Sequence, residues 1–381
     1  MKYHLNYKVN KTVLVISDLH LSAGLFIGAK KNDLEDFHSD RELIEFIEFY
    51  SRDQYASIPV EIIINGDFLD FLAVPYVPYH EDEYWSEEAA LSKLKLILNA
   101  HTEVFDAFEK YLRLPQKRVT YILGNHDAEM IFEKLQEEFL AFFSPAARSQ
   151  IEIRNFNFIE YIPLPGILIK HGHEYELAHH VSIGENIVKD ENDRRYFLPP
   201  WGSYYVTRVI NRFKSERKYI NSVRPVRTFL IHGILYDTFF TIRFMLASAF
   251  YFLMVRFIFL FRDGIGPKRL FNYLKEELRL FQDFENLTEE FLLERNDLKA
   301  FIVGHSHDPI FRIYPHGPIF INTGTWTKMI NLDFDKRNKD SLLTFAQINV
   351  VEFEKEGKMT EDLSINLNAW RGNDHLPYET F

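Results

Sequence analysis

The 381-residue sequence contains no cysteine, which excludes disulfide bonds and thiolate metal sites. Any bound metal must therefore be held by His, Asp, Asn or Glu side chains. The first residues, Met1–Asn6, also lack the apolar core of a signal peptide. We therefore expect a cytoplasmic protein.

Positive charge is scarce over the chain as a whole. The sequence has 44 Lys and Arg residues against 55 Asp and Glu residues, which gives a net charge of -11. This balance argues against general nucleic-acid binding. The hydrophobic content of 46% is near the globular norm, so a sizeable core can form. The length suits one large domain, or one domain with an insertion.

Apolar runs that end directly on polar residues organise the sequence, and they are typical of buried strands that give way to loops. The central run, Tyr121–Asp127, passes through a glycine turn and presents an amide, an imidazole and a carboxylate. In open α/β sheets, chemistry collects where strands end and loops begin. Four other runs have the same form: Val13–His20, Ile62–Asp70, Ile167–His173 and Phe301–His307.

Helical patterns separate these runs in the first part of the chain. Ser39 and Glu42 have the spacing of a capping box before an apolar helical face. One long helix is predicted from about Ser86 to Leu114, where Pro115 stops it, and another from about Met130 to Phe143. From Glu174 to Lys299 the strand signals vanish, and they return after Lys299. We therefore predict a core formed by residues 1–173 and 300–381, interrupted by a helical insertion at 174–299.

The strand ends carry side chains that suit a metal centre: Asp18, His20, Asp67, Asn125, His171, His305 and His307. A two-metal phosphoesterase site needs hard and borderline ligands, a bridging anion and room for water. Each of these motifs alone is more often a turn or a hydrogen-bonded core histidine. Their recurrence at five strand ends is hard to obtain by chance. The pattern therefore predicts that these groups bind divalent metal together.

The order Asp-x-His, Gly-Asp-x-x-Asp, Gly-Asn-His-Asp, a later His and Gly-His-x-His resembles the calcineurin-like metallophosphoesterase superfamily. The match covers the core from about Lys11 to His173 and from Lys299 to Phe353. The resemblance implies an α/β fold, namely a four-layer αββα sandwich with a helical insertion. It also implies two divalent ions, Mn, Fe or Zn, and hydrolysis of a phosphoester bond by a metal-activated hydroxide.

The resemblance also implies a role for each site residue. Asp18, His20 and His307 hold the first ion, Asn125, His171 and His305 hold the second, and Asp67 bridges both. His126 contacts the phosphate and protonates the leaving oxygen. We expect Asp127 to orient His126 by a hydrogen bond, as carboxylates beside metal centres do.

The neighbours of these motifs receive weaker assignments. Asp70 is expected to support its loop, and His173 either supports the site or lies in a solvated loop. Asn322–Thr325 resembles the last turn of the superfamily pattern, near the metals. Histidines without a motif, His179 among them, are expected to be ordinary residues.

The insertion combines a basic island with a long apolar run. Seven basic residues lie between Gly202 and Leu230 against the single acid Glu216, and Arg208, Arg212 and Arg217 are our candidates for substrate binding. The apolar run Phe244–Val255 falls short of the about 20 residues that a spanning helix needs. Two interpretations remain: a helical cap with its own core, or a surface for an amphiphilic substrate or an anionic membrane.

One branch of the superfamily has a comparable arrangement. The segments Asp18–Leu21 and Gly66–Phe71 resemble those of UDP-diacylglucosamine pyrophosphohydrolases, which carry a helical lipid-binding insertion between the later His and Gly-His-x-His. In the third motif, however, His126 stands where that branch often has arginine. We therefore expect a metal-dependent phosphoesterase or pyrophosphatase with a lipid-linked or other phosphorylated substrate, peripheral at the inner membrane surface through its insertion. A soluble nucleotide phosphodiesterase or protein phosphatase, and a non-catalytic scaffold, are the alternatives.

Overall fold

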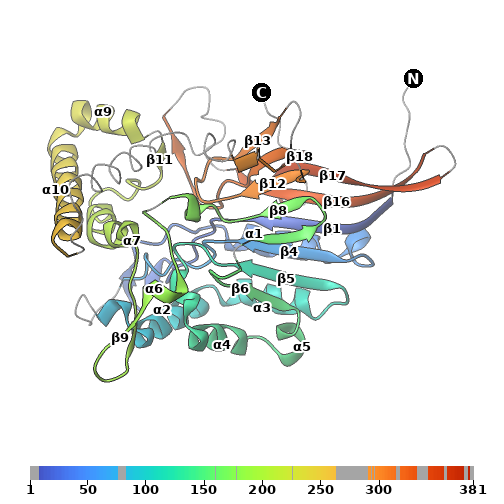
Figure 1. The fold of residues 1–381 in the computed structure, drawn as a ribbon, viewed down its shortest axis with the longest axis horizontal. Coiled ribbons are helices and arrows are strands. Elements are labelled where there is room, and N and C mark those ends of the chain that lie inside the picture. Colours follow the sequence, from blue (N-terminus) through green and yellow to red (C-terminus); the bar gives the residue numbers. More distant parts are fainter. Residues whose placement is uncertain are drawn as a thin grey trace.

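Two β-sheets packed face to face form the centre of the molecule (Figure 1). The computed structural model describes residues 8–75, 83–158, 160–176, 178–224, 226–262, 291–292, 294–295, 297–314, 318–332, 342–355, 358–372 and 376–377. The larger sheet has the strand order β18-β17-β16-β1-β4-β5-β6. Its strands are β18 (Leu376–Pro377), β17 (Lys358–Trp370), β16 (Leu343–Lys355), β1 (Lys8–Ile16), β4 (Val60–Asn65), β5 (Lys117–Ile122) and β6 (Ile151–Arg154).

The smaller sheet has five strands in the order β13-β14-β12-β8-β7. They are β13 (Ile310–Ile313), β14 (Ile319–Asn322), β12 (Ala300–Val303), β8 (Ile167–Ile169) and β7 (Tyr161–Leu164). In the larger sheet β1, β4 and β5 pair in parallel, and in the smaller sheet β8, β12 and β14 do so. The strands predicted to carry the site therefore end at the same edge of their sheet.

Side chains alternate between the two faces of each central strand, as the two-residue period of a strand requires. In β1, Val13 and Val15 point toward the smaller sheet and join one apolar cluster, while Leu14 and Ile16 point toward the helices and join another. The inter-sheet cluster is completed by Ile63 of β4 and by residues of the smaller sheet such as Ile302. The near-continuous apolar runs in the sequence reflect this burial on both faces.

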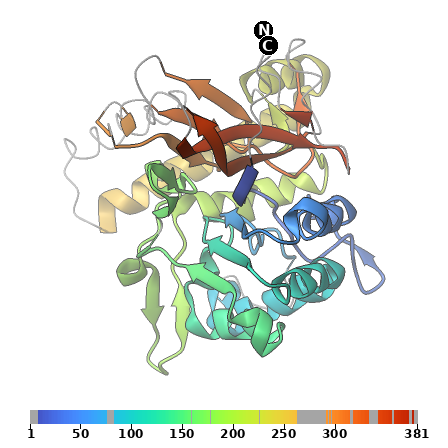
Figure 2. The same ribbon diagram turned by 90° about the vertical axis from the view of Figure 1, so that its right-hand side faces the viewer.

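Helices cover the outer face of the larger sheet, and Figure 2 shows them together on one side. They are α1 (Asp40–Phe49), α2 (Glu87–Ala100), α3 (Thr102–Leu112), α4 (Glu133–Ala141) and α5 (Pro145–Arg148). The single long helix predicted from Ser86 to Leu114 is in fact two, α2 and α3, divided at His101. The buried ring of His101 pairs with Asp40 and lies near Glu35, and this tertiary contact overrides the helical pattern.

The predicted capping box at Ser39 does not form. Ser39 precedes α1, but its side chain makes no cap hydrogen bond and instead donates to the carbonyl of Trp326, 3.4 Å away. Ser86 does cap α2, because its hydroxyl accepts from the amide of Ala89.

The predicted α/β sandwich is confirmed as the fold of the core. Helices, the seven-stranded sheet and the five-stranded sheet follow one another as layers. On the outer face of the smaller sheet, Phe291 and Leu292 pack against Leu168, Phe301 and Phe320. The predicted helical element at Lys268–Phe284 lies outside the described residues.

The segment between the two parts of the core contains more strand than the sequence suggested. Its helices are α6 (Ile183–Asn186), α7 (Trp201–Tyr205), a π-helical turn (Val206–Ile210), α8 (Asn211–Lys214), α9 (Val226–Tyr236) and α10 (Thr238–Arg262). Its strands are β9 (Ile187–Lys189), β10 (Arg195–Phe197) and β11 (Val223–Arg224). β11 pairs in parallel with β15 (Ile330–Asn331) of the core, so the segment is hydrogen-bonded to the domain it interrupts.

Helices α9 and α10 lie at one end of the molecule (Figure 1). The sequence indicated that the apolar run Phe244–Val255 is too short to span a membrane. The helix that contains it, α10, is longer than this run. By length and composition, Thr238–Val255 is sufficient to cross one, with a mean hydropathy of 1.6. One face of α10, with Phe240, Phe244 and Tyr251, packs against α8 and its neighbours. Length therefore no longer excludes a span, but this packing already occupies one side of the helix.

Candidate metal centre

The ends of five strands bring the predicted ligands together. Asp18 and His20 follow β1, Asp67 follows β4, and Asn125 follows β5. His171 follows β8 of the smaller sheet, and His305 and His307 follow β12. All of these side chains are buried or nearly so. The groups therefore meet at the seam between the two sheets.

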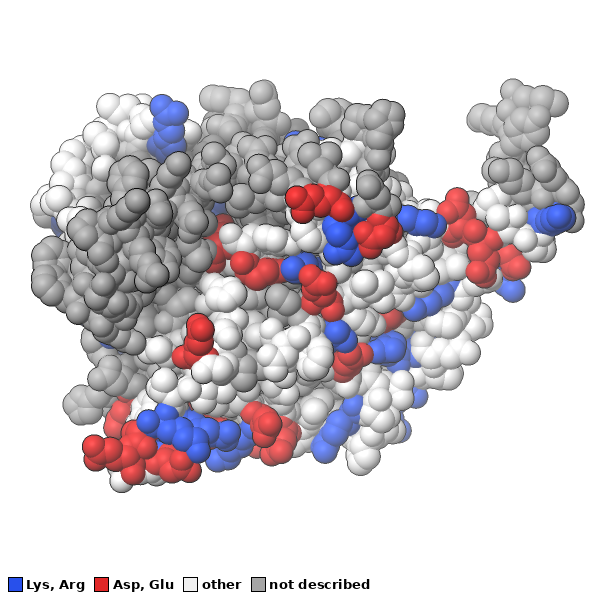
Figure 3. Space-filling model, viewed as in Figure 1, with Lys and Arg blue, Asp and Glu red and all other residues white. Residues whose placement is uncertain are grey.

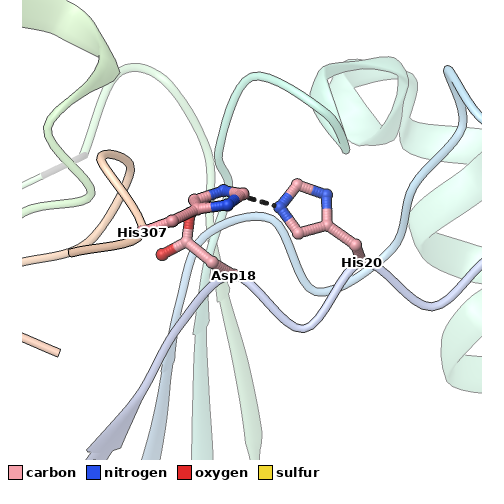
Figure 4. A group of neighbouring side chains, drawn as sticks. All are labelled: Asp18, His20 and His307. Atoms are coloured by element: carbon pink, nitrogen blue, oxygen red, sulfur yellow. Dashed lines mark hydrogen bonds and ion pairs between the residues drawn. The ribbon is translucent and has the colours of Figure 1, made fainter. Parts of the chain in front are cut away.

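A first cluster contains Asp18, His20 and His307 (Figure 4). The Nε2 atoms of the two histidines lie 3.1 Å apart, and Nε2 of His307 lies 3.2 Å from Oδ1 of Asp18. Donor atoms around a tetrahedral zinc ion are about 3.3 Å apart, given Zn–N distances near 2.0–2.1 Å. Burial lowers the pKa of His307 to about 4, although Asp18 opposes this shift. The ring is therefore neutral near pH 7, which is the form that binds metal.

A second cluster contains Asp67, His171 and His305, and Asp67 also faces the first. Oδ2 of Asp67 lies 3.3 Å from Nε2 of His171 and 3.9 Å from Nε2 of His20. Burial opposes ionisation of Asp67, but the charges of His171, His126 and His20 hold its pKa well below the ordinary value. The carboxylate is thus placed between the two clusters, as the predicted bridge requires.

Asn125 belongs to the second cluster by position. Its buried Oδ1 has no hydrogen-bond partner among the described residues. Buried acceptors without partners are uncommon, because each forfeits a hydrogen bond to water. Oδ1 of Asn125 is therefore available to an additional ligand.

The backbone at these positions adopts an unfavourable conformation. Positive φ angles occur at Asp18 (53°), His20 (57°), Asp67 (51°), His305 (69°) and His307 (63°). Left-handed backbone costs a non-glycine residue about 1–2 kcal/mol. Such strain gathers at functional sites, where the surrounding structure holds it in place. Here it turns side chains of both sheets toward one point.

Two glycines allow these side chains to approach the backbone closely. A Cβ atom at Gly66 would lie 2.2 Å from Nδ1 of His171. A Cβ atom at Gly124 would lie 2.2 Å from Oδ1 of Asp67 and 2.5 Å from its backbone nitrogen. The glycines of the Gly-Asp and Gly-Asn motifs are therefore required by the site itself.

Three of the predicted ligand histidines, one from each of three loops, have a hydrogen-bonding or charged partner beside a ring nitrogen. Nδ1 of His20 lies 3.1 Å from Oδ2 of Asp70, and Nδ1 of His171 lies 2.7 Å from the carbonyl oxygen of Asn65. Nε2 of His305 lies 3.1 Å from Oε2 of Glu176. Such partners orient a ligating imidazole and raise its basicity.

The assignment of Asp127 as the partner of His126 is wrong. The carboxylate of Asp127 turns back and accepts from the amides of Gly124 and Phe68 and from the hydroxyl of Tyr121. It thereby closes the turn that presents Asn125 and His126. Adjacent side chains on this tight turn diverge, so proximity in sequence gave the wrong partner.

Asp70 is the carboxylate that faces His126. Its Oδ1 lies 3.0 Å from Nδ1 of His126, while its other oxygen faces His20. Burial lowers the pKa of His126, but the charges of Asp70 and Asp67 raise it to about 9. Asp70 thus does more than support its own loop, since it links a predicted metal ligand to the predicted acid.

Glu176 and His179 also belong to the site and were missed in the sequence. Their side chains form a third group with His305 that can hold a metal ion, and Nδ1 of His179 lies 3.4 Å from Nδ2 of Asn125. Burial, together with His305, lowers the pKa of His179 to about 4. Both residues lie in the irregular stretch after His173, which carries no strand-end motif. His173 itself is buried beside His171 and is not a solvated loop residue.

The loop after β14 fastens the two ligand loops to each other. Nδ2 of Asn322 donates to the carbonyl of Gly304 and to Oγ of Ser306. The hydroxyl of Thr325 donates to the carbonyl of Asp18 over 2.6 Å. The predicted position of Asn322–Thr325 near the metal centre therefore agrees with these contacts.

A cavity of about 820 Å³ opens over the clusters. One side is polar and carries His20, Asp67, Asn125, His126 and His307. The insertion contributes a group of apolar side chains, together with polar ones such as Lys214, Ser222 and Arg224; the apolar group is Val206, Ile210, Val226, Phe229, Leu230, Phe244 and Met245. The volume is ample for a small phosphorylated molecule with an apolar group attached.

The three arginines predicted to bind substrate do not line this cavity. Val206, Ile210 and Lys214 follow each other at four-residue spacing and face it, so Arg208 and Arg212 lie on another side of the same helical segment. Arg208 lies over the ring of Tyr204, and Arg217 pairs with Asp237 at 2.7 Å. The basic residues that line the cavity are Lys214 and Arg224.

Comparison with known protein families agrees with this geometry. The family model described as calcineurin-like phosphoesterase matches residues 11–309, which include every predicted ligand. The chain belongs to the calcineurin-like phosphoesterase family. The match spans both parts of the core and the insertion between them. A comparison with curated proteins gave no match.

Several solved structures align along most of the chain at low similarity. A dimetal phosphatase from Danio rerio is 13% identical, covers 97% of this chain and 99% of its own, and gives a TM-score of 0.37. The calcineurin-like phosphoesterase YfkN from Bacillus subtilis is 10% identical, with coverages of 96% and 92% and a TM-score of 0.36. Vps29 from Entamoeba histolytica, complexed with zinc, is also 10% identical, with coverages of 93% and 98% and a TM-score of 0.26.

The residues of this chain suit the divalent metals typical of the calcineurin-like phosphoesterase family. The donor set consists of imidazole, carboxylate and amide oxygen, which fits Mn, Fe or Zn. The converging nitrogens of His20 and His307 and the unpartnered Oδ1 of Asn125 are the structural observations that fit a bound cation.

Proposed function

We propose that the protein is a dinuclear metal-dependent phosphoesterase or pyrophosphatase that acts on an amphiphilic, lipid-linked substrate. The observation that carries the proposal is a single cavity with metal-ligand clusters on one wall and an apolar wall from the insertion opposite. A phosphate and an acyl chain need these two environments at a short distance from each other.

The ligand set divides between two ions. Asp18, His20 and His307 would hold the first, Asn125, His171 and His305 the second, and Asp67 both. When bound, two divalent ions supply Lewis-acid activation of water and of the phosphoryl oxygens. Burial lowers the pKa of His171 and Asp67 raises it to about 10, so this ring must release a proton when a cation binds.

His126 has the position of a general acid for the leaving oxygen. It lines the cavity, and Asp70 faces its Nδ1 atom, which leaves Nε2 as the ring nitrogen for a substrate. The raised pKa keeps the ring protonated near neutral pH. In this role the proton on Nε2 passes to the leaving oxygen, and Asp70 holds the ring in place. Asp127 contributes indirectly, by holding the turn.

We propose further that α9 and α10 rest on a membrane surface. Large apolar side chains on the outer face of α10 are exposed, among them Phe239 (75%), Leu246 (65%), Phe250 (70%) and Leu253 (65%). A core helix of similar composition is mostly buried, whereas only 28% of the window Thr238–Val255 is. In Figure 3 the surface at the upper left, over α9, is mainly uncharged, whereas charged residues gather below it. An apolar face of this extent favours a bilayer interface.

The structure alters the expected role of the basic island in this docking. Arg217 pairs with Asp237, Lys218 with Asp33, and Lys214 with Asp36. These cations carry their counter-charges with them, so they add little attraction to an anionic surface. We therefore expect binding that depends mainly on the apolar face and changes little with salt.

Metal analysis tests the reaction class. The purified protein should hold two divalent ions, and a chelator should abolish hydrolysis of bis(p-nitrophenyl) phosphate. Asp67→Ala should lose both ions, whereas Asp106→Ala, at an exposed position on α3, should keep them. At most one ion in the wild type, with activity indifferent to chelator, would contradict the proposal.

Vesicle binding and a substrate panel test the amphiphilic part. The wild type should sediment with phospholipid vesicles, and a variant with Leu246, Phe250 and Leu253 changed to Ser should not. Met359→Ser, which alters an exposed apolar residue of β17, is the matched control. Micelles should raise activity on lipid-linked pyrophosphates. Equal activity on soluble nucleotides, with no vesicle binding, would favour a soluble phosphodiesterase instead.

A further inference from the structure

Arg224 is a cation of the insertion that is fixed beside the metal centre. It ends β11, whose backbone pairs with β15 of the core: the amide of Leu332 donates to the carbonyl of Arg224 over 2.8 Å. The guanidinium donates through Nη1 to the carbonyls of Asn221 and Val223, at 2.9 and 3.1 Å. Backbone and side chain are thus both held, and the residue lines the cavity.

The charge of Arg224 has no counter-ion within the described part of the chain. No carboxylate there comes within 4.0 Å of its guanidinium, in contrast to Lys214, Arg217, Lys218 and Arg243, which each pair with an acid. Asp308 acts on it only from a distance. Burial lowers the pKa of Arg224, which reflects the cost of holding this charge away from water. A partly buried cation without a counter-ion is unfavourable unless an anion binds to it.

The position of Arg224 differs from that of the groups assigned to the reacting phosphate. It lies on the side of His307, close enough to contribute to the lowered pKa of that histidine, for which burial is the main cause. Ser222, Ser306 and Thr327 line the same cavity and offer hydroxyl groups. Two residues beyond Arg224, α9 begins, and it supplies Phe229 and Leu230 to the apolar wall. An anion at Arg224 would therefore lie between the metal clusters and the apolar wall.

We propose that Arg224 binds a second phosphate group of the substrate, one that is not attacked. This inference rests on the proposed function and narrows its substrate class to molecules with two linked phosphates. The planar guanidinium suits the oxygens of a phosphate, which it can bind through two parallel hydrogen bonds. Arg224 thus selects pyrophosphate-linked substrates over simple phosphodiesters.

Binding of two non-hydrolysable probes to the metal-loaded protein tests this selection. Methylenediphosphonate carries both phosphate equivalents, whereas methylphosphonate carries one. By titration calorimetry, Arg224→Gln should bind methylenediphosphonate about ten- to a hundred-fold more weakly than the wild type, because a charge-assisted hydrogen bond is lost. Its affinity for methylphosphonate should stay within about three-fold. Arg227→Gln, an exposed neighbour that does not line the cavity, should resemble the wild type with both probes.

Arg224→Lys and metal analysis guard against a merely structural effect. The lysine keeps the charge but loses the two carbonyl contacts and the paired geometry, so its affinity for methylenediphosphonate should fall between those of the wild type and Arg224→Gln. Both variants should retain the metal content of the wild type. An equal loss of affinity for both probes, or no loss for either, would overturn the second-phosphate assignment.

Kinetics separate this inference from the proposed function. In Arg224→Gln, kcat/KM for a pyrophosphate diester should fall by the same ten- to a hundred-fold, while that for bis(p-nitrophenyl) phosphate should change little. If the wild type hydrolyses neither substrate but the binding affinity for methylenediphosphonate still depends on Arg224, the proposed reaction fails and the anion site stands. If hydrolysis proceeds and Arg224→Gln affects both substrates alike, the reaction stands and the anion site fails.

Discussion

Replacing Asp70 by Asn removes one charge from the centre of the site while keeping the shape of the side chain. The carboxylate faces Nδ1 of His126 at 3.0 Å and Nδ1 of His20 at 3.1 Å, and it also accepts from the amide of Ala73. Although burial opposes ionisation, the two histidines hold the pKa of Asp70 below its ordinary value. The carboxylate is therefore charged at neutral pH, and its loss is felt by both rings.

The expected defect depends on the leaving group. A positioned general acid contributes about 10²–10⁴-fold to the rate, and Asp70→Asn should lose a large part of this with alkyl phosphodiesters, whose leaving oxygen needs a proton. With p-nitrophenyl esters the loss should be much smaller, because p-nitrophenolate leaves without protonation. Metal affinity should fall less, by about 10–100-fold, because His20 loses only its orienting partner.

The pH dependence supplies a second signature. His126 must carry its proton to act as an acid, so activity on alkyl esters is present below its pKa and lost as the pH rises through it. Asp70 makes the largest contribution that raises this pKa, against the effect of burial. The alkaline limb of kcat should therefore move to lower pH in Asp70→Asn.

Steady-state kinetics on both ester types, at saturating metal and from about pH 6 to about pH 10, provide the measurement. Asp106→Asn, at an exposed position of α3, is the control and should leave both profiles unchanged. Equal losses with alkyl and p-nitrophenyl esters, together with an unmoved alkaline limb, would refute the link from Asp70 through His126 to the leaving oxygen.

Other perturbations test the framework around the site. Burial lowers the pKa of His101, but its acidic neighbours raise it to about 9. The stabilising contribution of the protonated ring is therefore complete below about pH 6.5, and about 3 kcal/mol of unfolding free energy is lost as the pH rises to 9. Chemical denaturation across this window should show that His101→Gln flattens this fall. Glu129→Ala should destabilise the protein by about 3–5 kcal/mol in the same assay, because it removes the carboxylate that lies 2.6 Å from the buried ammonium of Lys93. The double variant Lys93→Met with Glu129→Leu should recover most of that loss, because it leaves no buried charge. Gly124→Ala should lower metal content as well as activity, because its methyl group would overlap Asp67, and a variant with normal metal content would contradict the model of the turn.

The sequence predicts best where one residue type has one physical role. The strand-end motifs predicted positions that the fold does bring together, because apolar runs, glycine turns and donor groups coincide at Asp18, Asp67 and His305. The fold class followed from the same runs, since strands buried on both faces are apolar throughout.

Partners set by tertiary contacts could not be predicted in this way. Asp127 adjoins His126 in sequence, yet Asp70 from another strand end is the carboxylate that faces the ring. Glu176 reaches His305 from an irregular loop without any periodic signal. Arg224 belongs to a two-residue strand, β11, that pairs with β15, and a strand this short carries no pattern that a sequence can show.

The two sheets divide the predicted ligands between them, and this division would tie the selectivity for a bound ion to the hydrophobic core. The larger sheet supplies Asp18 and His20 to the first cluster, and the smaller sheet supplies His307. The spacing of the sheets, set by side chains such as Val15 and Ile302, would therefore determine how large an ion the predicted ligands could enclose. A methyl group added or removed between the sheets, remote from any donor atom, would shift the preference between a smaller ion such as Zn²⁺ and a larger one such as Mn²⁺.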